Sequence, residues 1–154
     1  MKIAIASDHA GFPLKASLAA YLKERGHEII DLGVDNAEVS ADYPDAAEAV
    51  ATAILEGRAE RGILSCGSGV GVSIAANKFP GIYAAICHDT YSAHQGVEHD
   101  NMNVLVVGAR VIGVNVANEL VDAFIGAEFN DEGRYARRFG MVQDFETQLK
   151  NPAE

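Results

Sequence analysis

Cys66 is the residue whose type and position best suit chemistry, because it ends a short apolar run and precedes a glycine-rich turn. That turn consists of Gly67, Ser68, Gly69, Val70 and Gly71. It leads into a helical pattern, so its backbone N–H groups should face outward, where they can bind an anion. The same groups and the helix dipole favour a thiolate, and we expect them to lower the pKa of Cys66. The alternatives are a buried structural thiol and a turn that uses glycine only for its shape.

Polar side chains also stand next to two other apolar runs. Asp8 and His9 directly follow the first run, where a histidine can donate to a phosphate or take part in acid–base chemistry, and where the pair could instead cap the next helix. His99, Asp100 and Asn101 form a polar cluster before the last run. From the residues alone, this cluster is either an ordinary polar loop or a site that uses His99 as a ligand or an acid.

Arginines are concentrated in the last third of the chain, at Arg110, Arg134, Arg137 and Arg138. Arg134 and Arg138 are four residues apart, so they share one helical face and could hold a phosphate dianion together. Arg137 points about 100 degrees away from Arg138. A solvated cationic face is the alternative interpretation of these arginines.

The overall composition limits the classes of function. A net charge of −10 disfavours nucleic acid as a partner, because phosphate backbones are bound by clustered cations. Two cysteines are too few for a disulfide framework and are interpreted as free thiols of a cytoplasmic protein. No apolar run is long enough to span a membrane. The length of 154 residues predicts a single domain spanning residues 1–154.

Short apolar runs alternate with helical patterns from end to end, which predicts successive βα units. Strands are expected over residues 2–7, 28–32, 62–66, 82–87 and 103–108. Helices are expected over residues 12–25, 46–56, from the glycine turn to 78, and over 90–98, 114–125 and 132–149. The predicted fold class is therefore α/β, a three-layer α/β/α Rossmann-like domain with a five-stranded, mostly parallel sheet.

The predicted topology divides the candidate residues between two edges of the sheet. Ligands in such folds bind at the carboxyl ends of the strands, and Asp8, Cys66 and Arg110 are expected there. His99, with the two residues after it, precedes the fifth strand instead. We expect this cluster to lie too far from the pocket of its own chain, which suggests a site shared between subunits.

Spacing argues against nucleotide and metal sites. A dinucleotide fingerprint would need glycine where Val72 stands, and the Gly-Lys pair of a P-loop is absent. His94 and His99 are five residues apart, which fits one helical face poorly. No metal site is predicted.

Several motifs follow one another along the chain: Ser7 to Gly11, Asp42 to Pro44, Cys66 to Gly71, Ala75 to Lys78, His99 to Leu105, Gly108 to Gly113 and Gly133 to Arg138. In this order they closely resemble type B ribose-5-phosphate isomerase over nearly the whole chain. The resemblance implies interconversion of ribose 5-phosphate and ribulose 5-phosphate, in the pentose phosphate pathway, through a cis-enediolate. It also implies that no metal or organic cofactor takes part.

The resemblance further implies roles for the site residues. Cys66 is the base that moves a proton between C2 and C1, Ser68 shuttles a hydroxyl proton, and His99 is the acid that helps to open the furanose ring. Backbone N–H groups of the glycine turn stabilise the oxyanion. The implied substrate contacts are Asp8, His9, Gly67, Gly69, Val70, Gly71, Asp100, Asn101, Arg110, Arg134 and Arg138.

A homodimer or homotetramer, in which the partner subunit completes each pocket, is also implied by the resemblance. Asp100 departs from it, since many members have asparagine there and a carboxylate cannot donate an amide hydrogen bond. Two alternatives stay open. One is an isomerase of another sugar phosphate, such as allose 6-phosphate, galactose 6-phosphate or a tetrulose phosphate. The other is a non-catalytic phosphosugar-binding module on the same fold. A third possibility, a receiver-like or nucleotide-binding domain, is disfavoured because the nucleotide motifs are missing.

Overall fold

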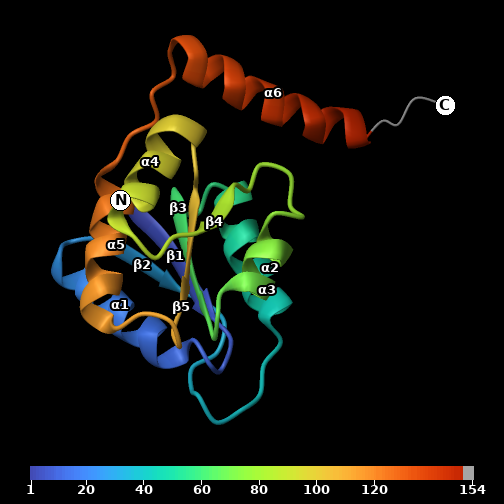
Figure 1. Cartoon of the computed structure of the whole chain (residues 1–154). Helices are drawn as coiled ribbons and strands as arrows, with labels where there is room; N and C mark the ends of the chain where they lie inside the picture. The colour runs from blue at the N-terminus through green and yellow to red at the C-terminus, as the bar shows by residue number, and fades with distance from the viewer. Residues whose placement is uncertain (151–154) are drawn as a thin grey trace.

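The computed structural model describes residues 1–150 and contains one sheet with helices on both of its faces (Figure 1). The strands are β1 (Lys2–Ser7), β2 (Glu28–Asp31), β3 (Arg61–Cys66), β4 (Ala84–Ile86) and β5 (Val104–Gly108). The helices are α1 (Phe12–Glu24), α2 (Tyr43–Leu55), α3 (Val70–Ala76), α4 (Thr90–Asp100), α5 (Val114–Gly126) and α6 (Gly133–Lys150).

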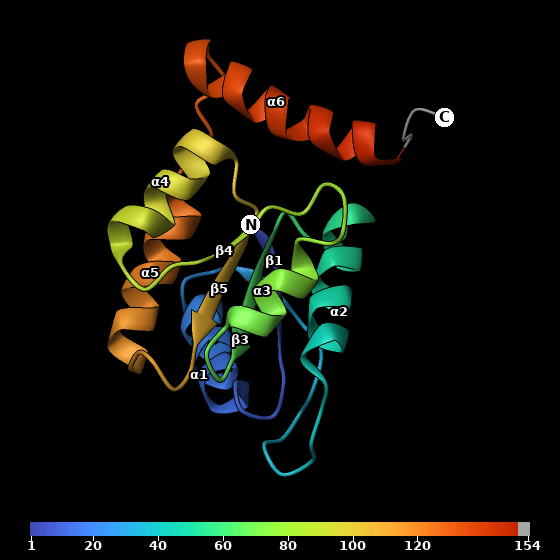
Figure 2. The ribbon, with the colours of Figure 1, turned by 45° about the vertical axis from the view of Figure 1, so that its right-hand side comes forward.

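The five strands are all parallel and lie in the order β2-β1-β3-β5-β4. Figures 1 and 2 show α1, α4 and α5 on one face of this sheet and α2 and α3 on the other. The predicted three-layer α/β/α architecture is therefore confirmed. Cys66 pairs with Gly108 across β3 and β5, so the carboxyl ends of these strands lie at the same level.

The unbroken apolar run of β5 is explained by a separate core on each face of the sheet. Leu105 and Val107 pack with α1, α4 and α5, whereas Val104 and Val106 pack with α2 and α3. All four side chains are fully buried. Because side chains alternate along a strand, a strand covered on both faces needs apolar residues at every position.

The largest differences between predicted and observed boundaries are in α2 and β4, and the other elements differ by two residues or fewer at either end. Helix α2 begins at Tyr43 rather than at residue 46, with Pro44 in its first turn, where a missing N–H leaves no hydrogen bond unmade. Strand β4 covers only Ala84–Ile86 instead of residues 82–87, since it lies at the edge of the sheet and pairs with β5 alone.

Helix α6 lies beyond the amino ends of the strands and crosses the molecule there (Figures 1 and 2). Phe139 anchors it by packing its ring edge against Tyr83 and Phe129. Glu146 accepts hydrogen bonds from the Gly81 N–H and the Tyr83 hydroxyl. Among the described residues, none of the helices has the length and apolar character that a membrane span requires.

Candidate active site

The Cys66 thiol stands at the end of β3 and is hydrogen-bonded to a carboxylate from another strand. Its Sγ donates to Asp8 Oδ2 at 3.2 Å, and both residues are buried. The second carboxylate oxygen, Oδ1, accepts the N–H of Gly11 at 2.9 Å. Asp8 is therefore held by the turn after β1 in a position that directs one oxygen at the thiol.

Close packing of two strand ends produces this pairing. A methyl group built on Gly11 would lie 2.2 Å from the carbonyl oxygen of Ser65, so only glycine allows the β1–α1 turn to approach the end of β3 this closely. The register sets Ser7 beside Ser65, one residue before each member of the pair. Asp8 and Cys66 are thus brought together by the register of the sheet and by the absence of a side chain at Gly11.

The environment of Cys66 overturns one sequence-based prediction, since burial raises the pKa of this thiol and the hydrogen bond and charge of Asp8 raise it further. The N–H groups of Gly67 and Gly69 lower this pKa, as expected from the turn, but their effect is smaller. The prediction of a lowered pKa is therefore wrong, and the raised pKa favours the neutral thiol of Cys66 at neutral pH.

The glycine turn leads from β3 into α3 as predicted. Gly69 has a φ of +88°, in the left-handed region that favours glycine. The Val70 N–H donates to the exposed Ser68 Oγ at 3.2 Å. A side chain on Gly71 would approach to 2.9 Å of the Tyr43 ring, so this tyrosine closes one side of the turn. Tyr43 belongs to a quoted motif, but the sequence indicated no role for it.

His9 and Arg110 also follow the carboxyl ends of strands, β1 and β5 respectively. The Nδ1 atom of His9 accepts the Ala41 N–H at 3.2 Å, and Ala41 belongs to the loop between β2 and α2. The guanidinium of Arg110 lies beside Gly67, where an added Cβ would be 3.4 Å from it, and the Arg110 N–H donates to the Gly67 carbonyl at 3.0 Å. We call Asp8, His9, Cys66, Ser68 and Arg110 the carboxyl-edge cluster.

His99 belongs to a different part of the molecule. Its ring stacks on Tyr135 of α6 with centroids 4.3 Å apart, and its Nδ1 lies 2.8 Å from the Gln95 amide nitrogen. Arg134 donates to the Tyr135 hydroxyl at 2.8 Å and places its guanidinium 4.9 Å from that ring. Arg138 is also exposed, one helical turn later. We call His99, Arg134, Tyr135 and Arg138 the amino-edge cluster; no sequence pattern pointed to Tyr135.

The two clusters lie at opposite edges of the sheet. His99 precedes the start of β5, whereas Cys66 is level with its last residue, Gly108. The five residues of β5 span about 13 Å at roughly 3.3 Å per residue. His99 therefore lies at the opposite edge of the sheet from Cys66 of its own chain, as the predicted topology indicated.

Asp100 and Asn101 do not join His99 in contacting Tyr135. Asp100 is exposed and borders a hollow of about 330 Å³ that is also lined by Asn77 and Met102. Asn101 ends α4 with a φ of +52°, a conformation that asparagine tolerates better than most residues. The identity of Asn101 therefore has a backbone explanation, independent of any contact with a ligand.

The second thiol provides a contrast to Cys66. Cys87 is buried beside Met102, and burial raises its pKa to about 11. The neighbouring residues have structural roles, since His88 Nε2 accepts the Gly108 N–H and Asp89 caps α4 by accepting from the Ser92 N–H. Cys87 is therefore a structural thiol that packs in the core.

Comparison with known proteins gives consistent matches. The family model described as Ribose/Galactose Isomerase matches residues 3–142. The chain is 46% identical to ribose-5-phosphate isomerase B of Escherichia coli, covering 94% of this chain and 96% of that protein. It is 44% identical to D-erythrulose-4-phosphate isomerase of Pectobacterium atrosepticum, covering 86% and 88%. The structure of ribose-5-phosphate isomerase B from Clostridium thermocellum superposes with a TM-score of 0.93 at 47% identity, covering 97% and 99%.

Proposed function

The chain belongs to the ribose/galactose isomerase family, and on this premise we propose that it interconverts D-ribose 5-phosphate and D-ribulose 5-phosphate. The observation that carries the proposal is the buried thiol of Cys66, hydrogen-bonded to Asp8 at the mouth of an N–H-rich turn. An aldose–ketose isomerase needs a base for a carbon-bound proton and donors for the oxyanion that forms beside it. A base and such donors occur together here.

Cys66 is the proposed base. Its thiol hydrogen is directed at Asp8 Oδ2, so the Asp8 carboxylate is the group within reach to take that proton when the thiolate forms. The thiolate then removes the C2 proton of the open-chain aldose and returns it to C1. The electron pair of the broken C2–H bond forms the C1–C2 double bond of the enediolate and then the new C1–H bond, while the hydroxyl proton on O2 is transferred to O1, so the step balances without an oxidant.

The oxyanion of the enediolate is proposed to lie against the glycine turn. The N–H groups of Gly67 and Gly69 already approach Cys66 closely enough to lower its pKa. The Val70 N–H donates to the Ser68 hydroxyl, so an oxyanion bound at this N–H would have to replace Ser68 as the acceptor. A hydroxyl in this position can donate to a substrate oxygen and exchange its proton there.

We propose that the complete site forms between two copies of the chain, in a homodimer or a homotetramer built from such pairs. His99 would open the furanose ring bound in the partner's carboxyl-edge cluster, and Arg134 and Arg138 would hold its phosphate. Support comes from the distance between the two clusters and from exposed apolar side chains that a monomer would leave in water. These side chains are Val70 and Ile74 on α3 and Met141, Val142 and Phe145 on α6.

Further features follow from the proposal. The reaction needs no metal or organic cofactor, since the base and the oxyanion donors belong to the chain. A cytoplasmic location suits two free thiols, because that compartment keeps cysteines reduced. The whole chain, residues 1–154, would act as one domain.

The preferred substrate is tested by comparing sugar phosphates of different length. The ratio kcat/KM should be highest for ribose 5-phosphate when it is measured beside allose 6-phosphate, galactose 6-phosphate and D-erythrulose 4-phosphate. The tetrulose phosphate is included because a relative 44% identical bears that name. A higher value for any of the others would transfer the assignment to that sugar. Binding without turnover of all four would instead indicate a phosphosugar-binding module.

A further inference from the structure

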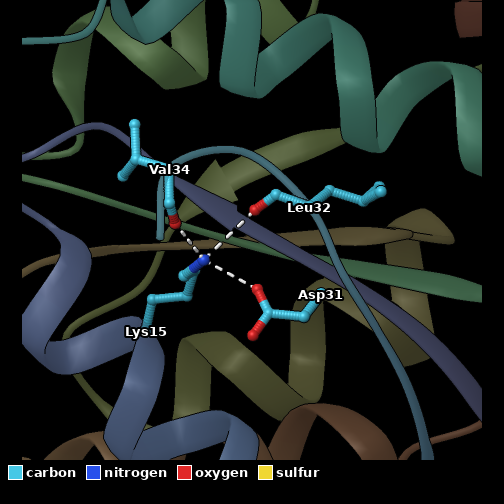
Figure 3. Close-up of polar contacts among 4 residues, drawn as sticks. All are labelled: Lys15, Asp31, Leu32 and Val34. Atoms are coloured by element: carbon cyan, nitrogen blue, oxygen red, sulfur yellow. Dashed lines mark hydrogen bonds and ion pairs between the residues drawn. The ribbon is translucent and has the colours of Figure 1, made fainter. Parts of the chain in front are cut away.

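Lys15 is a buried cation that the proposed mechanism does not use. It lies on α1 with only 2% of its surface exposed. Figure 3 shows its Nζ donating to Asp31 Oδ1 at 2.7 Å and to the carbonyl oxygens of Leu32 and Val34 at 3.2 and 2.6 Å. An ammonium group has three hydrogens, so these three contacts satisfy it completely.

The three acceptors lie where β2 passes into the loop formed by residues 32–42, which connects β2 to α2: Asp31 ends the strand, and Leu32 and Val34 belong to the loop. A connection of this length without helix or strand carries a high conformational entropy, so fixed contacts are needed to hold it in one arrangement. Its middle is folded into a turn, in which Asn36 Oδ1 accepts the N–H groups of Glu38 and Val39, each at 3.0 Å. These two hydrogen bonds restrict the middle of the loop, which lies between the segment held by Lys15 and Ala41.

The end of the loop reaches the carboxyl-edge cluster. The Ala41 N–H donates to His9 Nδ1 at 3.2 Å. A backbone N–H can only donate, so Nδ1 must be the acceptor, and the neutral ring carries its hydrogen on Nε2. The other ring nitrogen of His9 thus presents an N–H donor, which is the form that can bind a phosphate or sugar oxygen.

We infer that Lys15 is a positioning residue for His9, acting through the 32–42 loop to hold the Ala41 N–H against Nδ1. Lys15 does not belong to the carboxyl-edge cluster and contacts no substrate atom in this proposal. The desolvation of a buried ammonium group offsets much of its attraction to Asp31, so this ion pair adds little to the stability of the helix. The hydrogen bonds of Lys15 can instead fix one arrangement of the loop, which an apolar residue could not do. The inference rests on the proposed function only where it assigns His9 a substrate contact.

The test compares Lys15→Met with Lys23→Met. Lys23 is an exposed lysine of the same helix, and both lysines border one hollow of about 560 Å³. In protein with ¹⁵N-labelled histidine and no substrate, long-range ¹H–¹⁵N spectra above neutral pH should report the Nε2–H tautomer of His9 in the wild type and in Lys23→Met. Lys15→Met should give a mixture of tautomers. Its KM for ribose 5-phosphate should rise about tenfold while kcat changes little.

A double-mutant cycle separates positioning from general loss of stability. If Lys15 acts through His9, adding Lys15→Met to His9→Gln should not raise KM further. Full additivity of the two effects, or an unchanged tautomer in Lys15→Met, would overturn the inference. If Lys15→Met does not fold, as judged by circular dichroism, Asp31→Ala takes its place. That variant removes the side-chain acceptor of Lys15 Nζ, and an unchanged tautomer there also overturns the inference.

The spectra are recorded without substrate, so their outcome does not depend on the assigned activity. A wild-type protein that isomerises none of the four sugar phosphates would refute the proposed function. The tautomer of His9 would still decide the role of Lys15.

Discussion

The carboxyl-edge and amino-edge clusters differ in how the chain builds them. Cys66 and Asp8 are 9% and 8% exposed, and strand ends and tight turns hold them in place. The side chain of His99 is 29% exposed, and Arg134 and Arg138 lie on the surface of α6. The first cluster is preformed within one chain, whereas the second is displayed on helices, as a surface that meets a partner would be.

The two clusters also differ in their electrostatics, since one contains a buried thiol and the other exposed guanidinium groups. Burial and a neighbouring carboxylate raise the pKa of Cys66 and thereby favour its neutral form at neutral pH. Exposed guanidinium groups stay charged and solvated, so they can attract a phosphate without a desolvation penalty in the free protein. The buried thiol of Cys66 at one edge of the sheet thus contrasts with the exposed guanidinium groups of Arg134 and Arg138 at the other.

The largest expected effect is at Cys66. Cys66→Ala removes the proposed base, and we expect kcat to fall about 10³-fold, within the range that general acid–base catalysis contributes. Binding of ribose 5-phosphate, measured by calorimetry, should be kept. Cys87→Ala is the matched control, since it removes the structural thiol and should leave kcat of the folded protein unchanged. Unaltered turnover in Cys66→Ala would exclude this residue as the base.

Mixed dimers test whether the two clusters act together across subunits. His99→Ala and Cys66→Ala should each be nearly inactive alone. After unfolding and refolding together in equal amounts, about a quarter of wild-type activity should return, because half of the randomly formed dimers carry one intact site of two. Activity that stays at the level of the separate variants would show that each chain works by itself.

The arginines of α6 should give a smaller effect, confined to affinity. Arg138→Ala should raise KM about ten- to a hundredfold, as expected for a charge-assisted hydrogen bond to phosphate. Arg137→Ala is the control, because the neighbouring side chain points to another face of the helix. Steady-state kinetics with ribose 5-phosphate distinguish the two variants. Equal effects would mean that net charge, not a specific grip, attracts the substrate.

The smallest effect concerns the reactivity of the thiol in the absence of substrate. The charge and hydrogen bond of Asp8 raise the pKa of Cys66, so Asp8→Asn should lower that pKa and increase the thiolate fraction at neutral pH. The rate of alkylation by iodoacetamide should rise several-fold, and its pH profile should move to lower pH. Tryptic mass spectrometry assigns the modification to Cys66 or Cys87. A slower reaction would mean that Asp8 activates the thiol of the free protein.

Local patterns in the sequence predicted the fold well, since the apolar run of β5 and the glycine turn before α3 depend on neighbouring residues. Contacts between distant residues explain what could not be predicted. Asp8 and Cys66 are separated by 58 positions, so the residues near Cys66 in the sequence do not indicate the carboxylate that raises its pKa. The stacking of Tyr135 on His99 likewise depends on where α6 docks, which no local pattern encodes.

Gly11 has a consequence for how this chain can change over evolutionary time. A methyl group there would overlap the Ser65 carbonyl, and the N–H of the same residue holds Asp8 toward Cys66. A mutation at this codon that pushed the turn away from β3 would also draw the carboxylate away from the thiol. The packing of the turn against β3 and the placement of the Asp8 carboxylate therefore depend on the same residue. Substitutions of Gly11 should accordingly not accumulate as neutral changes.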